Sequence, residues 1–435
     1  MVPIGPATEN GAMFGSPGNP PRTDARHSLQ PPARSCAVDF LRGIAILLVI
    51  GCHFAVAPAS AGHLEPVAET WYRIGWAGVD LFFVLSGFLV SGLLFAEFKR
   101  NERVDARRFL VRRGFKIWPA YFAYLAFVAA WLAWHPSGGA AGAGPAGLWP
   151  NLLHVQNYFG TPRVHTWSLA VEEHFYLLGA GLAAFFLVRP RFEWVRRAFP
   201  LLALVALVIV ALARHAGFAS GGRGALNLFA THLRFDGLLI GSLVAYFAHF
   251  EPHRLQWSRR YPLPCIVAGL ALAAPVLVLT PDHSALTAGV GLTVMYAGFA
   301  IAMLGVLGLE QGSERERRVV AAAPVRWIAR MGFFSYGIYL WHIDLAQVPM
   351  RKLGVLVSPL GLPDTFVWLG VTAIYVALAF LVGAGMSRLI EIPCLALRDR
   401  LFPSKLPAGK PVGIPAAESA PAASTADRRA LAAGS

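Results

Sequence analysis

The sequence predicts an all-α protein that crosses a membrane many times. Hydrophobic residues make up 56% of the 435 residues and the mean hydropathy is +0.53, which is more apolar than a soluble domain of this size. The apolar residues gather in long runs, and the short connections between the runs carry most of the charge. Backbone polar groups in lipid must be satisfied within the protein, so we expect the runs to be helices.

Ten apolar runs are each long enough to span a bilayer. We expect helices at 39–58, 75–96, 115–134, 167–188, 198–214, 226–250, 263–280, 286–308, 333–350 and 366–389.

The two ends of the chain differ from this membrane domain, which we place at 36–402. Residues 1–35 and 403–435 are rich in Pro, Ala, Gly and Ser, and they are predicted to be disordered tails. The connection near 135–166 is the longest on its side of the membrane. It is too short for a domain, but it could cover a site that faces outward.

The net charge of +14 is explained by membrane topology and not by a nucleic-acid-binding surface, because the basic residues lie in short connections between apolar runs. The stretch 97–116 alone holds eight Lys and Arg residues. When the connections between runs are numbered in chain order, the even-numbered ones (97–114, 189–197, 251–262 and 309–332) hold most of the basic residues. Basic residues favour the cytoplasmic side, so both termini are expected there. The odd-numbered connections hold few cations, which are Arg73, Arg163, Arg214, Arg223, Arg351 and Lys352.

The four cysteines show no metal-ligand spacing, so we interpret them as free thiols. No metal site and no tightly bound cofactor is expected.

The first apolar run carries two ionisable residues at an informative spacing. Arg42 and His53 are eleven residues apart, which is three helical turns plus about 20°, so they share nearly one face about 16 Å apart. Ionisable residues inside a bilayer are costly and usually functional.

The expected topology sorts the polar residues within the membrane into two layers. The outer layer contains His53, Asp80, Glu172, Glu173, Arg234 and Asp236. The cytoplasmic layer contains Arg42, Arg112, Arg113, Lys116, Arg388 and Glu391. Cations suit phosphate groups, and a histidine beside carboxylates suits proton abstraction from a hydroxyl. A long donor with a phosphorylated head, such as coenzyme A, would match the Arg42–His53 spacing.

Within these layers we expect two ion pairs. Glu172 or Glu173 should pair with Arg234 or orient His53, and Arg388 should pair with Glu391.

Seven ordered blocks together resemble the acyltransferase-3 family of integral membrane O-acyltransferases. They are Arg42 with His53 (R-x10-H), Gly78–Phe88 (GVDLFFVLSGF), Arg112–Pro119 (RRGFKIWP), Trp167–Tyr176 (WSLAVEEHFY), Phe235–Gly241 (FDGLLIG), Ser335–His342 (SYGIYLWH) and Arg388–Pro393 (RLIEIP). Lys116 stands where the family more often has Arg, which keeps the charge but loses the planar fork.

The resemblance implies a multi-pass enzyme of the inner membrane that moves an acyl group, often acetyl, from acyl-CoA to a hydroxyl. Surface or exported carbohydrates and lipid-linked glycans are the expected acceptors. Some relatives carry an additional esterase-like domain. We expect none here, so the membrane domain would act alone or with a separate partner.

The site residues are assigned roles on this basis. His53 is expected to be the general base, assisted by Glu172, Glu173 or Asp80. Arg42 should bind or orient the donor. The residues expected to contact the donor with it are Arg112, Arg113, Lys116 and Tyr339.

Other interpretations stay open. His53 could form an acyl-histidine intermediate or only pack between helices, and Arg42 could be an interfacial cation. A transporter of a polar or anionic solute is the main alternative, although the chain has no repeated halves. A catalytically inactive membrane scaffold is the third.

Overall fold

The computed structural model describes residues 35–54, 56–135, 144–187, 193–225 and 227–403. Within these ranges the chain forms helices and no strand, so the all-α prediction is confirmed. The tails predicted at the two ends lie outside the described residues, apart from Ser35 and Pro403.

Each of the ten expected runs overlaps a helical stretch. These stretches are α1 (Cys36–Cys52), α3 (Ala77–Asn101), α4 (Ala106–Trp134), α7 (Trp167–Leu182), α8 (Glu193–Ala225), α9 (Thr231–Phe250), α11 (Pro262–Leu279), α12 (Leu292–Gln311), α15–α16 (335–357) and α17–α18 (364–401). Eight helices among the described residues are long and apolar enough to cross a membrane. The 17-residue α1 and the α15–α16 stretch are not among the eight.

Shorter helices lie in the connections or continue the long ones. They are η1 (Pro58–Leu64), α2 (Glu65–Ile74), η3 (Pro145–Leu148), α5 (Trp149–Leu152), α6 (Gln156–Phe159), η4 (Val164–Thr166), η5 (Ala183–Leu187), η7 (Pro252–Leu255), α10 (Gln256–Arg260), η8 (Thr287–Gly291), α13 (Glu314–Val320), α14 (Ala323–Phe333), η9 (His342–Gln347), η10 (Ser358–Leu360) and η11 (Ser387–Glu391).

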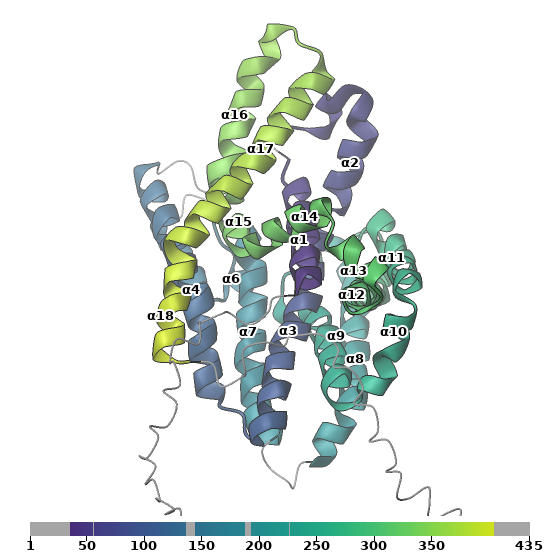
Figure 1. The fold of residues 1–435 in the computed structure, drawn as a ribbon. Coiled ribbons are helices and arrows are strands. Elements are labelled where there is room, and N and C mark those ends of the chain that lie inside the picture. The colour runs from purple at the N-terminus through teal and green to yellow at the C-terminus, as the bar shows by residue number, and fades with distance from the viewer. Residues whose placement is uncertain (1–34, 55, 136–143, 188–192, 226, 404–435) are drawn as a thin grey trace, which may run out of the picture.

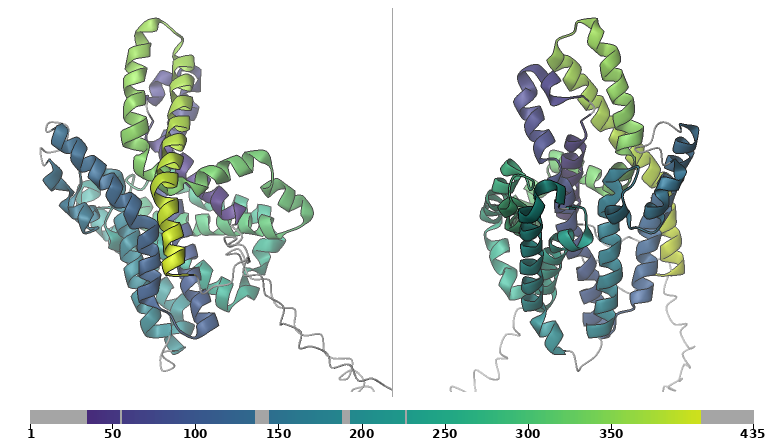
Figure 2. Two further views of the ribbon diagram at one scale, coloured as in Figure 1. Left: turned by 60° about the vertical axis from the view of Figure 1, so that its left-hand side comes forward. Right: turned by 180° about the vertical axis from the view of Figure 1, so that it is seen from behind.

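The helices form one bundle with a projecting hairpin. Helices α3, α4 and α7 run side by side, and α18 lies along α4 (Figures 1 and 2). Helix α16 and the first part of α17 extend beyond the bundle, next to α2 and η1. Because α1 packs against α3, α14 and α15, it lies inside the bundle, where its polar residues face protein.

Glycines allow the central helices to touch backbone to backbone. A Cβ atom on Gly87 of α3 would collide with the Leu238 carbonyl of α9, and one on Gly241 of α9 would collide with the Val84 carbonyl. Small residues permit this close approach between membrane helices. The contact fixes α3, which carries part of the site, against α9.

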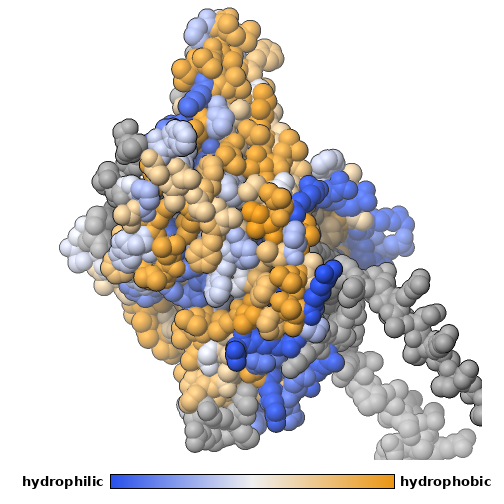
Figure 3. Space-filling model, turned by 90° about the vertical axis from the view of Figure 1, so that its left-hand side faces the viewer, coloured by the Kyte–Doolittle hydropathy of each residue, from blue (hydrophilic) through white to orange (hydrophobic). Residues whose placement is uncertain are grey.

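The outer surface is apolar where lipid would meet it. Only 22% of the most apolar part of α8 is buried, and its large exposed side chains include Leu204, Val208, Ile209 and Leu212. Figure 3 shows apolar side chains over much of one face, with hydrophilic ones gathered toward one side and the lower part. These features support a multi-pass membrane protein.

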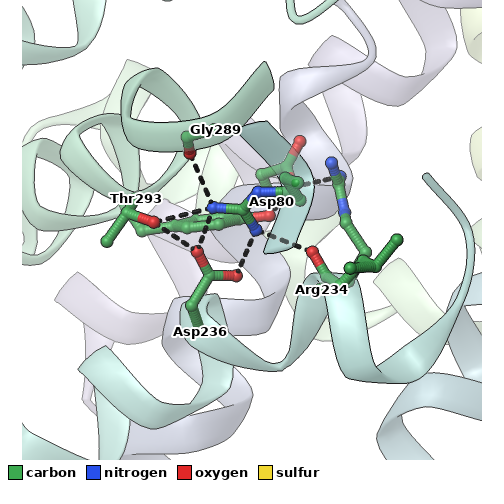
Figure 4. Close-up of polar contacts among 8 residues, drawn as sticks. Asp80, Arg234, Asp236, Gly289 and Thr293 are labelled. Atoms are coloured by element: carbon green, nitrogen blue, oxygen red, sulfur yellow. Dashed lines mark hydrogen bonds and ion pairs between the residues drawn. The ribbon is translucent and has the colours of Figure 1, made fainter. Parts of the chain in front are cut away.

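Helix α8 corrects one sequence-based expectation. The run expected at 198–214 extends from 193 to 225, so Arg214 lies inside a helix and not in a connection. Its side chain is fully buried and forms a bidentate pair with Asp236, at 3.0 and 2.7 Å. Thr293 donates to the same carboxylate at 2.7 Å, and Arg214 also donates to the Gly289 carbonyl at 3.0 Å (Figure 4). Arg214 was expected in a connection because nothing near it in the sequence indicates a carboxylate that would neutralise it inside a helix bundle.

Candidate active site

The candidate site consists of two neighbouring cavities. The first has a volume of about 100 Å³ and is lined by Arg42, so we call it the Arg42 cavity. The second, the His53 cavity, has a volume of about 1050 Å³ and is lined by His53. Val79 and Tyr339 line both, so these two side chains form a shared wall.

Three cations face the Arg42 cavity. Arg42 comes from α1, and Arg113 and Lys116 come from successive turns of α4. None of the three forms an ion pair or hydrogen bond with a described residue. The Arg113 guanidinium instead lies 5.6 Å from the centre of the Tyr176 ring. Such a concentration of unpaired positive charge suits phosphate groups.

Two carboxylates from α7 also line the Arg42 cavity. Glu172 accepts hydrogen bonds from Ser86 at 2.8 Å and Tyr176 at 2.6 Å. Glu173 accepts one from Trp118 at 3.3 Å, and its Oε1 is buried without a hydrogen-bond partner. The expected contact of either carboxylate with Arg234 or His53 is therefore wrong, since α7 directs both toward the Arg42 cavity.

Asp80 is the actual partner of Arg234. The two form a buried ion pair, and Tyr296 donates to the same Asp80 oxygen at 2.7 Å (Figure 4). Arg234 lines the His53 cavity, whereas Asp80 does not, so the carboxylate contacts Arg234 on the side away from the cavity. Asp80 is thus placed to position Arg234 and not to contact His53.

His53 stands at the end of α1, in the wall of the larger cavity. Its Nδ1 is 2.9 Å from the Val49 carbonyl oxygen and 3.4 Å from Nε2 of His342. Nδ1 of His342 is in turn 2.9 Å from the Tyr339 carbonyl oxygen and 3.1 Å from that of Ile338.

These distances determine which nitrogens carry hydrogen. A carbonyl oxygen only accepts, so Nδ1 of each ring must be the protonated nitrogen. Neutral His342 then presents its Nε2 lone pair to the same Nδ1 hydrogen of His53 at 3.4 Å, as a second acceptor beside the Val49 carbonyl at 2.9 Å. The remaining Nε2 of His53 is unprotonated, which is the form that a general base requires.

The wall between the cavities is held by hydrogen bonds. The Tyr339 hydroxyl is 2.6 Å from the Ser168 hydroxyl and also donates to the His165 carbonyl. Arg42 and His53, which were expected to match the two ends of one long donor, therefore line different cavities, with Tyr339 and Val79 between the two.

Three other expected site residues lie away from these cavities. Arg112 pairs with Asp399 of α18 at 3.1 Å and lines neither cavity. The expected pair of Arg388 with Glu391 is wrong: the Arg388 guanidinium lies 5.0 Å from the Phe334 ring centre, and Glu391 accepts from Ser387 at 3.1 Å. The two residues lie in a π-helical turn, which changes their relative direction.

Comparison with known proteins assigns the chain to a family. The family model described as an acyltransferase domain matches residues 37–387. The chain belongs to the acyltransferase-3 family. The resemblance inferred from the seven blocks is thereby confirmed, and the matched range includes both cavities.

Curated members of the acyltransferase-3 family are similar over much of this chain. A peptidoglycan O-acetyltransferase of Listeria monocytogenes is 26% identical over 82% of this chain and 55% of its own length. A putative peptidoglycan O-acetyltransferase of Bacillus subtilis is 28% identical over 73% and 50%. An O-acetyltransferase of Staphylococcus aureus is 26% identical over 67% and 49%. The chain thus spans about half the length of these relatives. No solved structure matches it.

Sequence reasoning missed several residues of the His53 cavity. His165 lines it, with a ring 5.8 Å from that of His342. Arg163 and Asp344 form a bidentate pair in its wall, and Tyr124 donates to Asp344 at 2.6 Å. His165 and Arg163 belong to the connection expected to cover an outward-facing site. His342 is the last residue of the Ser335–His342 block, so this block could have indicated a second histidine near His53.

Proposed function

We propose that this chain is an O-acyltransferase that moves an acyl group, in the first place acetyl, from acyl-CoA to a hydroxyl of an exported or cell-surface carbohydrate. The family membership supports acyl transfer, and the relatives' names support an O-acetyl product on a cell-wall carbohydrate. The observation that carries the proposal is the hydrogen bonding of His53, which leaves Nε2 free in the wall of the larger cavity.

In the proposed reaction His53 is the base. Nε2 takes the proton of the acceptor hydroxyl as that oxygen attacks the thioester carbonyl carbon. The carbon–sulfur bond then breaks, the acyl group stays on the acceptor oxygen, and the sulfur leaves as coenzyme A thiolate. The imidazolium of His53 returns its proton to the thiolate, so no other acid is required.

His342 is proposed as a positioning residue for this step. Its neutral Nε2 is a second acceptor for the His53 Nδ1 hydrogen, beside the nearer Val49 carbonyl, and the two acceptors together orient the ring. In many enzymes a carboxylate orients the base; here the nearest hydrogen-bonding side chain is a second imidazole.

Arg42, Arg113 and Lys116 are proposed to bind the phosphates of the donor, which would come from the cytoplasmic side. The Arg42 cavity of about 100 Å³ has room for only a few water molecules, so the donor requires it to open. Tyr339 lies where a thioester would pass from Arg42 to His53, and we propose that it moves when the donor binds. The chain would act in the inner membrane.

A transfer assay tests this function. The full chain in lipid vesicles is mixed with acetyl-CoA labelled in the acetyl group and with soluble glycans from cells that encode it. The proposal expects free coenzyme A thiol together with label on the glycan. Movement of a solute across the vesicle membrane, with no release of thiol, would favour the transporter instead.

A further inference from the structure

The His53 cavity is lined by several basic residues that the positive-inside rule does not account for. Basic residues are normally depleted from connections on the non-cytoplasmic side, and the sequence has six in or near those connections. Three of the six, Arg73, Arg163 and Arg351, line the His53 cavity. Arg234 lines it as well.

These four arginines come from separate parts of the fold. Arg73 is in α2, Arg163 precedes η4, Arg234 is in α9 and Arg351 is in α16. Cations that serve only to anchor helix ends would have no reason to converge from four segments on one cavity.

The arginines divide into a paired and an unpaired set. Arg163 is paired with Asp344, and Arg234 with Asp80, so both belong to the cavity wall. Arg73 and Arg351 are exposed, and neither forms an ion pair with a described residue. Arg73 makes one hydrogen bond, to the Val278 carbonyl at 3.3 Å. Two guanidinium groups are thus available to a ligand.

The remaining lining suits a large polar molecule. Tyr72, Trp76 and Trp131 present aromatic surface, and the volume of about 1050 Å³ is at the upper end of the range for ligand pockets, about 300–1,000 Å³. Guanidinium groups bind carboxylates and phosphates through paired hydrogen bonds.

We propose that the acceptor in the His53 cavity is an acidic glycan, with a carboxylate or phosphate held by Arg73 and Arg351 near the hydroxyl that is acylated. This inference rests on the proposed function and narrows its acceptor to one chemical class.

The first experiment separates candidate acceptors by charge. Soluble glycans from cells that encode the chain are divided by anion exchange into a retained, acidic fraction and an unretained, neutral one. Each is incubated with the full chain and labelled acetyl-CoA. The inference expects label in the acidic fraction. Label only in the neutral fraction would overturn the inference but leave the proposed function standing. Absence of both label and thiol release would remove the proposed function itself.

The second experiment assigns the charge recognition to the two arginines. The Arg73→Gln/Arg351→Gln double variant should raise the acceptor KM by about tenfold or more, because charge-assisted hydrogen bonds are lost. The KM for acetyl-CoA should stay unchanged. Lys352→Gln is the matched control, since Lys352 is the next residue in α16 but does not line the cavity.

Two results would contradict this assignment. An increase in the acetyl-CoA KM instead would mean that these arginines bind the phosphates of the donor. An effect seen in phosphatidylglycerol vesicles but not in phosphatidylcholine vesicles would mean that they bind lipid headgroups.

Discussion

Nε2 of His342 lies 3.4 Å from Nδ1 of His53, although the two residues are 289 positions apart in the chain. His342 is fully buried, and its own Nδ1 is held by the Tyr339 and Ile338 carbonyls. The pair therefore has one arrangement of hydrogens, which leaves Nε2 of His53 as the basic atom.

Replacement of His342 should lower turnover without weakening substrate binding. His342→Leu removes the second acceptor of the His53 Nδ1 hydrogen and leaves the Val49 carbonyl. We expect kcat to fall by up to about tenfold, as the loss of one hydrogen bond of roughly 1.4 kcal/mol would produce. Both KM values should stay within about twofold. Steady-state kinetics of thiol release measure the two quantities separately.

A conservative variant distinguishes positioning from packing. His342→Gln keeps an acceptor oxygen and should recover part of kcat, whereas a residue needed only to fill space would be replaced equally well by Leu. Equal activity of the Leu and Gln variants would contradict the positioning role.

Tyr339 should control the passage between the cavities. Tyr339→Ala removes part of the wall between Arg42 and His53, together with the bond to Ser168. We expect a larger share of thiol release to occur without acceptor, because water would reach the thioester. The ratio of thiol to transferred label measures this share. Tyr375→Phe serves as control, since this buried tyrosine lines neither cavity. An unchanged ratio in Tyr339→Ala would show that Tyr339 does not control the passage between the cavities.

The buried pair of Arg214 and Asp236 should matter for stability. Asp236→Leu leaves the Arg214 guanidinium buried without its counter-charge, which typically costs about 3–5 kcal/mol. The double variant Arg214→Met/Asp236→Leu removes both charges and should unfold at a higher temperature than the single variant. Thermal unfolding in detergent measures the order. A double variant as unstable as the single one would show that the network acts through its other hydrogen bonds.

His154 should make the protein less stable in acid. This residue lies between α5 and α6, and burial against Tyr121, with His174 nearby, lowers its pKa from 6.5 to about 4. Since the unfolded chain takes up this proton below about pH 6.5, while the folded chain resists it down to about pH 4, stability should fall as the pH decreases through this window. His154→Gln should reduce the fall in unfolding temperature between pH 7 and pH 4.5. An identical pH dependence in both proteins would exclude His154 as the cause.

The sequence predicted the helices well because their signal is local. Apolar runs of sufficient length located all ten stretches. The extent of α8 was underestimated because Arg214 interrupts the apolar run, and only the fold reveals that Asp236 neutralises it.

The site was predicted less completely because its contacts are distant in sequence. Helical spacing predicted one shared face for Arg42 and His53, but it did not reveal Tyr339 and Val79 between them. Nor could spacing identify Asp80 as the partner of Arg234, since these residues are 154 positions apart. Glu172 and Glu173 were expected in the same layer as Arg234, but they face the Arg42 cavity and Arg234 faces the His53 cavity.

One kinetic comparison tests whether His53 performs the chemistry and Arg42 binds the donor. Thiol release and label transfer are measured for the wild-type chain, His53→Ala and Arg42→Ala in the same vesicles. We expect His53→Ala to lower kcat by about 10²- to 10⁴-fold with normal membrane insertion, and Arg42→Ala mainly to raise the acetyl-CoA KM. Full transfer activity in correctly inserted His53→Ala would mean that His53 is not the base.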